Sequence, residues 1–550
     1  MMHKKIFPVL FIGLAFTTQP TESCTNYIVT RGASSDGSVM MTYSADSHTL
    51  YGELYHWPSA RYPEGTLMEI HEWDTGKFLG KIPQVPETYH VTGNMNQYQV
   101  AIGESTFGGK EELVDTTGIM DYGSLMYIAL QRSKTAREAI GIITSLVKEY
   151  GYYSSGESFS IIDKEEAWIL EMIGKGPGRK GALWVAVRIP DGYVSGHANQ
   201  ARIRTFPLND PENCLYEEEV ISFAREKGWF SGKDSEFSFS DTYAPVDFMG
   251  ARACEMRVWT FFHKVADGMD QYWDYVTGAN LGHRMPLYIK PDRKIEPREV
   301  MNAMRDHLEG TELDMSLDLG AGPFGLPYRW RPMEFEVDGK AYVHERTTAT
   351  QQTGWWFMAQ ARSYLPDLIG GIFWFGVDDT GTSCLTPIYA SSTEVPHSYA
   401  QGNGDLLTYR EDAAFWIFTR VAHIAYLRYR DIYPDIRKVI DQLESEALSI
   451  IPAVDATATA LMKTNPGEAR KFLTQYSVGR AEYTIQQWKE LYAYLMVKYS
   501  DGNRKKEAGG QFMRNAYGQP ESPDHPGYSP SWLRRITEDH GEKILIPRNN

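Results

Sequence analysis

The chain has 550 residues, of which 42% are hydrophobic and 23% are charged, and it carries a formal net charge of -16. This composition is typical of a globular protein and excludes a disordered chain. The acidic balance argues against nucleic acid as a partner, because binding a phosphate backbone requires clustered Lys and Arg.

The first residues have the order of a secretory leader. Lys4 and Lys5 precede an apolar run from Ile6 to Phe16, and the polar stretch Thr17–Ser23 follows. That run is about half of the ~20 residues that a membrane span requires. We therefore expect residues 1–23 to be removed, and the mature protein to be exported, periplasmic or extracellular, without stable membrane insertion.

From residue 24 to about residue 203 the pattern is mostly of strands, with one helix. Thr135 and Glu138 have the spacing of a capping box before an apolar-periodic run that ends near Tyr150. Strands are expected at Thr25–Arg31, Ser38–Ser44, Gln99–Gly103, Ser158–Asp163, Ala167–Ile173, Leu183–Ile189 and Tyr193–Gly196. This mixture predicts an α+β fold or a layered α/β/β/α architecture.

Later segments are mostly helical. Helix-period apolar residues predict helices over Pro297–Leu308, Asp412–Tyr433, Pro434–Ile450 and Ala481–Tyr499. Gly371–Val377 is expected to be a strand that returns to the first region. From Asp501 onward, Gly, Pro, Asn and charged residues predict a loop-rich tail with one packed patch at Tyr528–Ile536.

Four cysteines occur, too few for a disulfide framework in a chain of this length. Cys214, Cys254 and Cys384 are expected to be small buried apolar residues, since no pair has the close spacing of a zinc or redox site. Cys24 differs because it becomes the first residue once the leader is removed. It then carries both a thiol and a free α-amino group.

This pairing predicts a nucleophile at Cys24. An α-amino group has a pKa near ~7.7–8.0 and a thiol a pKa near ~8.5, so the amine can accept the thiol proton at neutral pH. A nucleophile activated by its own N-terminal amine is an established catalytic arrangement, and it needs no separate histidine. The sequence therefore indicates a cysteine amide hydrolase.

A hairpin turn around Ser35 would pair positions whose numbers sum to about 70, which places Cys24 opposite Asp46 with Cβ atoms ~5 Å apart. A carboxylate at Asp46 could then hold the α-ammonium group. Without the terminal cysteine, Asp46 would be interpreted as an ordinary aspartate that caps a turn.

A cysteine just after a leader is also the site of lipid attachment in bacterial envelope proteins. Such sites follow Leu-Ala-Gly or a close relative, whereas Thr-Glu-Ser precedes Cys24 here. A flexible tether normally follows the anchor, but here a strand is expected at once. We favour the nucleophile over the anchor.

Several motifs occur one after another along the chain. They are Cys24-Thr-Asn-Tyr-Ile-Val-Thr-Arg-Gly-Ala-Ser-Ser-Asp-Gly-Ser38, Ser44-Ala-Asp46, Gly93-Asn-Met-Asn-Gln97, Ile102-Gly-Glu-Ser105, Trp168-Ile-Leu-Glu171, Val187-Arg-Ile-Pro-Asp-Gly-Tyr193 and Gly196-His-Ala-Asn-Gln-Ala-Arg-Ile203. Weaker motifs continue to about residue 400. This set resembles the dipeptidases of peptidase family C69, which are N-terminal nucleophile hydrolases related to penicillin V acylase and the conjugated bile acid hydrolases.

The resemblance implies a four-layer αββα sandwich with a helical C-terminal extension. We accordingly expect a hydrolase domain over residues 24–400, a helical extension over residues 401–500 and a loop-rich tail over residues 501–550. It also implies that a peptide bond in small peptides, above all dipeptides, is hydrolysed through a thioester, without a metal or organic cofactor.

Residue by residue, the resemblance makes Cys24 the nucleophile, Asp46 the aspartate beside the α-amino group and Asn199 a donor to the oxyanion. Glu104 and Ser105 fall where the family lines its substrate pocket. An acidic Glu104 would suit the ammonium group of a substrate, and a structural salt bridge is an equal alternative.

One position departs from the family pattern. Many relatives carry an arginine three positions before the aspartate, where this chain has Tyr43, which we place in the substrate pocket. A tyrosine donates a hydrogen bond but has no fixed charge, so thiol activation and substrate preference are open at this position. His197, beside Asn199, is interpreted as structural.

Two alternatives to a dipeptidase stay open. The first is an amidase or acylase that acts on N-acyl amino acids, bile-salt conjugates or penicillins with the same catalytic centre. The second is a lipid-anchored envelope binding protein. The sequence does not decide the side-chain preference, whether the chain forms a homo-oligomer, or what removes the leader.

Overall fold

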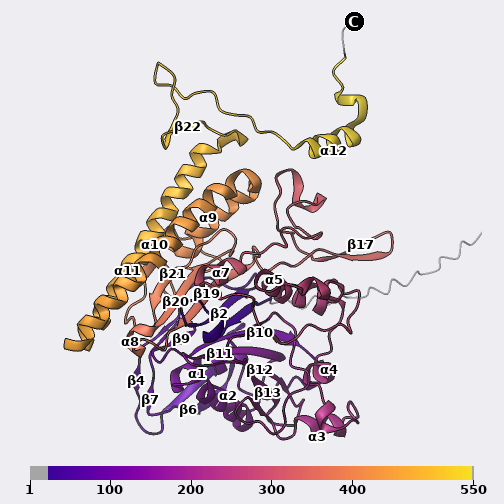
Figure 1. Cartoon of the computed structure of the whole chain (residues 1–550), viewed down its shortest axis with the longest axis vertical. Coiled ribbons are helices and arrows are strands. Elements are labelled where there is room, and N and C mark those ends of the chain that lie inside the picture. Colours follow the sequence, from indigo (N-terminus) through magenta and orange to yellow (C-terminus); the bar gives the residue numbers. More distant parts are fainter. Residues whose placement is uncertain (1–22, 548–550) are drawn as a thin grey trace, which may run out of the picture.

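The computed structural model describes residues 23–547 and is built around two antiparallel sheets (Figure 1). The first sheet contains, in spatial order, β16 (Tyr288–Ile289), β14 (Val194–His197), β1 (Asn26–Val29), β2 (Val39–Asp46), β19 (Thr353–Ala361), β20 (Gly371–Val377) and β21 (Thr386–Tyr389). The second contains β15 (Cys214–Tyr216), β13 (Ala182–Arg188), β12 (Ala167–Gly174), β11 (Gly156–Ile162), β10 (Ala101–Gly108), β9 (Met95–Asn96), β8 (Val91–Thr92) and β3 (His56–Trp57). With the helices, this confirms the predicted mixed α+β fold.

The two sheets pack on each other, because β1 and β2 of the first contact β10 of the second. A cluster of buried apolar side chains joins them and includes Ile28, Val39 and Met41 from the first sheet and Ala101 and Ile162 from the second. Helices α1 (Tyr122–Arg132), α2 (Ala136–Tyr150), α5 (Met256–Val265) and α7 (Pro297–Ala303) pack against these sheets. Helices α1 and α2 share this cluster, whereas α5, α7 and β14 contribute to a second buried cluster that includes Tyr27 and Val29, so the first sheet lies between two cores.

Helix α2 begins where the capping motif predicts. Thr135 is its N-cap and accepts a hydrogen bond from the backbone nitrogen of Glu138. The carboxylate of Glu138 accepts from the backbone nitrogen of Lys134 rather than from that of Thr135. Hydrogen bonds of this kind satisfy backbone donors that a helix N-terminus leaves unpaired.

The C-terminal helices α9 (Ala414–Leu427), α10 (Tyr429–Thr464) and α11 (Pro466–Lys498) pack on one another and beside β20 and β21 (Figure 1). The predicted boundary between the first two helices, at Pro434, is wrong. The chain leaves the helical conformation at Arg428, whose φ is -152°, and Pro434 lies inside α10. The sequence therefore predicted helices here correctly but divided them at the wrong residue.

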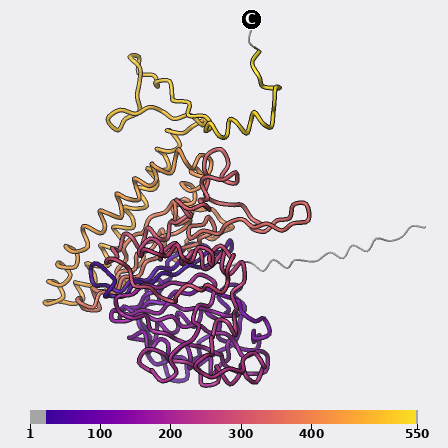
Figure 2. The backbone as a smooth tube through the Cα atoms, turned by 45° about the vertical axis from the view of Figure 1, so that its right-hand side comes forward, coloured from indigo at the N-terminus to yellow at the C-terminus, as the bar shows by residue number. Residues whose placement is uncertain are grey.

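The tail from Asp501 extends away from the body of the molecule (Figures 1 and 2). It holds two short strands, β22 (Glu507–Ala508) and β23 (Gln511–Phe512), and helix α12 (Pro530–His540). The packed patch predicted at Tyr528–Ile536 is wrong, since α12 has no buried residue. Its apolar side chains are spaced for a helix face, but that face has no core of the described chain to pack against.

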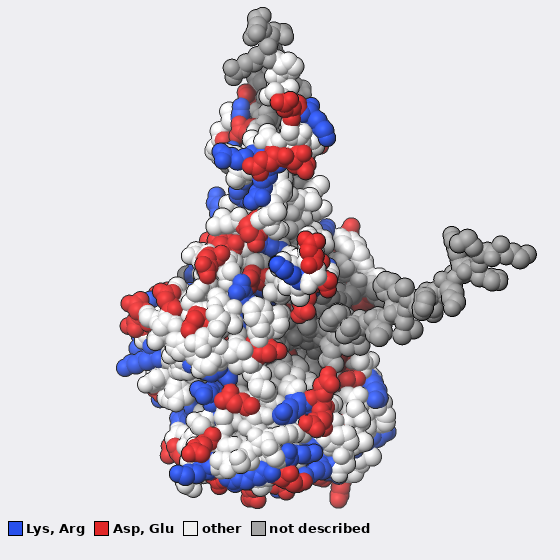
Figure 3. Space-filling view, turned by 90° about the vertical axis from the view of Figure 1, so that its right-hand side faces the viewer, with Lys and Arg blue, Asp and Glu red and all other residues white. Residues whose placement is uncertain are grey.

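The remaining elements are short. They are the strand pairs β4 (Ala60–Arg61) with β7 (Glu87–Thr88), β5 (Leu67–His71) with β6 (Phe78–Pro83) and β17 (Glu334–Val337) with β18 (Lys340–Val343), and the helices α3 (Val220–Glu226), α4 (Phe239–Tyr243), α6 (Trp273–Val276) and α8 (Asp367–Gly370). On the face shown in Figure 3, basic and acidic side chains are interspersed.

None of the four cysteines, all of which lie among the described residues, forms a disulfide; Cys214 and Cys384 are buried as predicted, and Cys254 is only half-buried. Residues 1–22, which hold most of the predicted leader, lie outside the described residues. Within residues 23–547, none of the helices combines the length and the apolar character needed to cross a membrane.

Candidate active site

Cys24 lies two residues before β1 (Asn26–Val29), a strand in the interior of the first sheet. β1 pairs with β14 on one side and with β2 on the other. On the β2 side Ile28 lies opposite Met41, and Thr25 forms an isolated bridge with Ser44. The residue numbers of each facing pair therefore add up to 69, as 28 and 41 do, and 25 and 44.

This register corrects the predicted pairing by one residue. The backbone nitrogen of Ser23 donates to the carbonyl oxygen of Asp46 at 2.9 Å, so Ser23, and not Cys24, lies opposite Asp46. Cys24 falls opposite Ala45. The cause is the connection between the strands, in which a short 3-10 turn at Arg31–Ala33 precedes the bend, whereas the prediction assumed a simple turn around Ser35.

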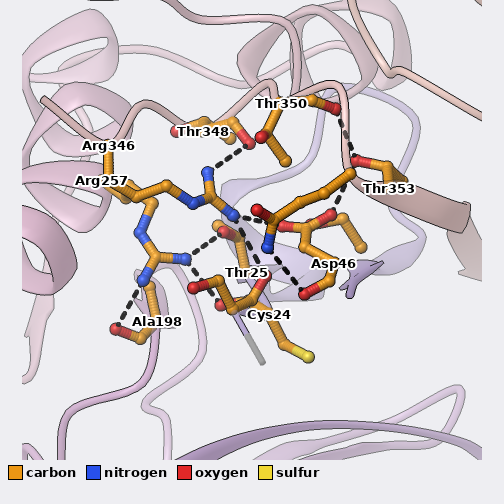
Figure 4. Close-up of polar contacts among 12 residues, drawn as sticks. Cys24, Thr25, Asp46, Ala198, Arg257, Arg346, Thr348, Thr350 and Thr353 are labelled. Atoms are coloured by element: carbon orange, nitrogen blue, oxygen red, sulfur yellow. Dashed lines mark hydrogen bonds and ion pairs between the residues drawn. The ribbon is translucent and has the colours of Figure 1, made fainter. Parts of the chain in front are cut away.

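A shift of one residue changes the face to which each side chain points. The Cys24 sulfur and the Asp46 carboxylate therefore lie on opposite faces of the sheet, and Figure 4 shows the sulfur pointing away from Asp46. The Asp46 carboxylate is fully buried. It accepts hydrogen bonds from Arg346 Nη2 at 2.6 Å, Thr353 Oγ1 at 2.7 Å and Ser44 Oγ at 3.0 Å.

The thiol of Cys24 contacts a buried carboxyl group. Its Sγ lies 3.4 Å from Glu104 Oε1 and 3.8 Å from Tyr43 Oη, and the Tyr43 hydroxyl donates to the same Glu104 oxygen. Burial raises the pKa of Glu104, and burial together with the charges of Cys24 and Glu104 raises the pKa of Tyr43. Tyr43 therefore acts here as a neutral hydrogen-bond donor.

Asn199 follows β14 and has a left-handed backbone, with φ of 56°. Its backbone nitrogen donates to Ser105 Oγ at 3.1 Å, and its side-chain Nδ2 donates to the carbonyl oxygen of Thr106 at 2.7 Å. Its Oδ1 accepts from Arg257 Nη2 at 2.9 Å. Because arginine can only donate, this contact fixes which end of the amide is oxygen.

Arg257, on α5, joins Cys24 to the segment that carries Asn199, and Figure 4 shows it between Cys24, Thr25 and Ala198. Its Nη1 donates to the carbonyl oxygen of Cys24 at 2.8 Å and to Thr25 Oγ1 at 2.9 Å, and its Nη2 donates to Asn199 Oδ1. The side chain is 1% exposed, so these bonds lie in a dry interior. Arg257 was not predicted from the sequence.

Arg346 is the second arginine that the sequence did not reveal. Its Nη2 donates to Asp46 Oδ2 and, at 3.1 Å, to the carbonyl oxygen of Ser23. Its Nη1 donates to the carbonyl oxygens of Thr347 and Thr348. The departure at Tyr43 indicated that a cation was missing, but no local motif marks position 257 or position 346.

Ser105 and His197 form a buried group beside the Asn199 loop. Ser105 Oγ lies 2.6 Å from His197 Nδ1, and Ser160 Oγ lies 2.8 Å from Nε2. Burial lowers the pKa of His197 to about 3, so its ring is neutral at ordinary pH. Ser105 thus contacts both His197 and the Asn199 backbone, which fits a structural role for the histidine.

Known proteins match this chain over the region that contains the candidate site. A sequence model of peptidase family C69 matches residues 23–442. A probable dipeptidase of Salmonella dublin is 25% identical over 397 residues, which cover 67% of this chain and 81% of the relative. A probable dipeptidase B of Streptococcus pyogenes serotype M1 is 21% identical over 534 residues, covering 92% and 99%.

A third relative, a probable dipeptidase of Latilactobacillus sakei, is 22% identical over 497 residues, which cover 86% of this chain and 95% of the relative. These relatives span most of the chain, and the family match includes every site residue described above. The chain belongs to peptidase family C69.

Proposed function

We propose that the protein is a cysteine dipeptidase that hydrolyses the peptide bond of dipeptides through a thioester on Cys24. The observation that carries this proposal is the setting of Cys24 at the start of an interior strand, with its sulfur 3.4 Å from buried Glu104 and its carbonyl oxygen bonded to the arginine that holds Asn199. The relatives named above as probable dipeptidases support the same substrate class.

The proposal includes the fold and maturation of an N-terminal nucleophile hydrolase. Two facing sheets with helices packed on them support a four-layer αββα sandwich over residues 24–400, followed by a helical extension and a tail. Residues 1–23 would direct export, and their removal would expose the Cys24 amine. The match to the family, which begins beside Cys24, supports that cleavage point.

In the proposed mechanism the Cys24 amine accepts the thiol proton while Sγ attacks the carbonyl carbon of the substrate. The tetrahedral oxyanion is stabilised by the Asn199 amide, which Arg257 orients. The C–N bond then breaks, the leaving amine takes the proton from the Cys24 ammonium, and a thioester remains. Water attacks this thioester with the same amine as base and restores the thiol.

Replacing Asn199 should lower kcat by ~10²–10³-fold with a smaller change in KM, because its bond to the oxyanion strengthens mainly in the transition state. Asn199→Gly is the informative variant, since glycine adopts a φ of 56° without strain. Asn199→Ala serves as its control, because both variants lack the amide but only alanine is strained. An unchanged kcat in both variants would exclude Asn199 from the oxyanion site.

Glu104 tests the dipeptide assignment. If its carboxylate receives the substrate's ammonium group, N-acetylation of a good dipeptide should lower kcat/KM by ~10–100-fold, the range of a charge-assisted hydrogen bond. In Glu104→Gln this preference should nearly disappear. Tyr43→Phe is the matched control, because it removes the hydroxyl that donates to Glu104 but keeps the carboxylate.

The pH dependence has a defined sign. Burial raises the pKa of Glu104 above its ordinary value, so KM for the free dipeptide should fall as pH rises through this raised pKa. The Glu104→Gln variant should lack this change. N-acyl amino acids cleaved faster than free dipeptides would instead assign the protein to the acylases.

A further inference from the structure

The guanidinium groups of Arg257, Arg331 and Arg346 lie close enough to Asp46 and to one another to interact electrostatically. The charges of Arg257 and Arg331 disfavour the protonated form of Arg346, and Asp46 favours it. With burial as the largest cause, the pKa of Arg346 is lowered to about 10. Arg346 is only 6% exposed, so its guanidinium has little contact with water. A buried cation is costly unless its hydrogen-bond donors find acceptors.

Arg346 has donor capacity that the described chain leaves unused. Its Nε is buried without a hydrogen-bond partner among the described residues. Its Nη2 donates to the carbonyl oxygen of Ser23, the residue that maturation would remove. After cleavage before Cys24, this donor would lose that acceptor. A vacated oxygen position beside an unpartnered donor is suited to a carboxylate, which accepts from two nitrogens of one guanidinium.

A small polar cavity lies beside Arg346. Its lining includes Arg331, Arg346, Gln352 and Glu345, whose carboxylate is paired with Arg252. The Arg331 guanidinium donates to Gln352 Oε1, and Gln352 Nε2 donates to the Asp46 carbonyl oxygen at 3.0 Å. Arg331 is thus connected to the backbone position opposite Ser23. Figure 4 shows Arg346, Thr350 and Thr353 gathered around Asp46 on this face.

The leaving half of a substrate must approach this face. The Cys24 nitrogen that protonates the leaving amine is the atom now bonded to the Ser23 carbonyl carbon. A leaving amine beside that nitrogen carries its α-carboxylate only two bonds away. The carboxylate can therefore reach the position of the Ser23 oxygen, although the sulfur lies on the other face of the strand.

We propose that in the mature enzyme Arg346, assisted by Arg331, binds the α-carboxylate of the dipeptide's C-terminal residue at the position of the Ser23 carbonyl. This inference rests on the proposed function and deepens it. Glu104, on the side of the sheet where the Cys24 sulfur lies, would bind the substrate's ammonium group. The two ends of the dipeptide would thus bind side chains of opposite charge. One added residue lengthens an extended peptide by ~3.3–3.6 Å, and a tripeptide then cannot satisfy both ends.

The direct test compares a dipeptide with its C-terminal amide on the wild-type enzyme. We expect kcat/KM to fall by ~10–100-fold for the amide, because a charge-assisted pair becomes a weaker neutral contact. In Arg331→Gln and Arg346→Lys this preference should shrink to a few-fold. Arg31→Gln, which removes a surface arginine paired with Glu165, should retain the wild-type preference.

Each outcome decides a different point. Equal hydrolysis of the dipeptide and its amide by the wild-type enzyme would overturn the carboxylate site and leave the dipeptidase intact. Failure to hydrolyse any free dipeptide would overturn the proposed function itself. Stronger competitive binding by the peptide Thr-Glu-Ser, the sequence of residues 21–23, than by a dipeptide would assign the arginines to the released leader and also overturn the proposal.

Discussion

Replacing Cys24 with alanine is expected to lower kcat by ~10⁴–10⁶-fold while the protein stays folded. Loss of a covalent nucleophile removes the pathway itself, and the residual rate comes only from binding and the oxyanion site. The fold should tolerate the change, because the contacts of Cys24 with Arg257 use its backbone carbonyl oxygen. Activity should be measured with a dipeptide, and the melting temperature should shift by only a few degrees.

The chain provides matched controls for this experiment. Cys384→Ala removes a thiol that is also buried and lies outside the candidate site, and it should keep dipeptide hydrolysis near the wild-type level. Cys24→Ser should retain weak activity, since an alcohol is harder to deprotonate than a thiol. Full activity in Cys24→Ala would place the nucleophile elsewhere.

A protein that begins at Ser23 is expected to show no turnover, whereas one that begins at Cys24 is active. In the longer form the Cys24 nitrogen is an amide, which cannot accept the thiol proton. Ser23 also occupies the position opposite Asp46, where its carbonyl oxygen accepts from Arg346. The single residue Ser23 therefore converts the basic Cys24 amine into an amide and also occupies a donor of Arg346.

The two forms should be compared after mass spectrometry confirms each N-terminus. Both should show the same circular dichroism spectrum, because Ser23 adds only one residue to the edge of the site. Substantial hydrolysis by a verified Ser23 form would contradict activation by the terminal amine. An acyl chain found on Cys24 would instead support the lipid-anchored alternative.

Much of the fold could be predicted from local patterns. Gly371–Val377 is β20 as predicted, and the strands Ala167–Ile173 and Leu183–Ile189 lie within one residue of β12 and β13. The interior strand β19 was missed. Every residue of β19 is buried, so its sequence lacks the alternation of apolar and polar residues by which a half-buried strand is recognised.

The candidate site was predictable only in part. Cys24 and Asn199 are joined through Arg257, but the Asp46 carboxylate lies on the face opposite the Cys24 sulfur. The predicted register was wrong by one residue because the geometry of the connecting turn cannot be derived from residue type alone. Arg257 and Arg346 contact residues 233 and 323 positions away. A sequence pattern records neighbours along the chain, and these pairs become neighbours only through the packing of α5 and the segment before β19.

The first strand of the mature enzyme would be held from both sides, by β14 and by β2. Chain termini ordinarily fray, and a catalytic group placed on one would have to be ordered again with each substrate. A terminus that is hydrogen-bonded on both sides within a sheet has already lost its conformational freedom during folding. Its amide protons should exchange with solvent as slowly as those of the core, so the end of this polypeptide behaves as part of its interior.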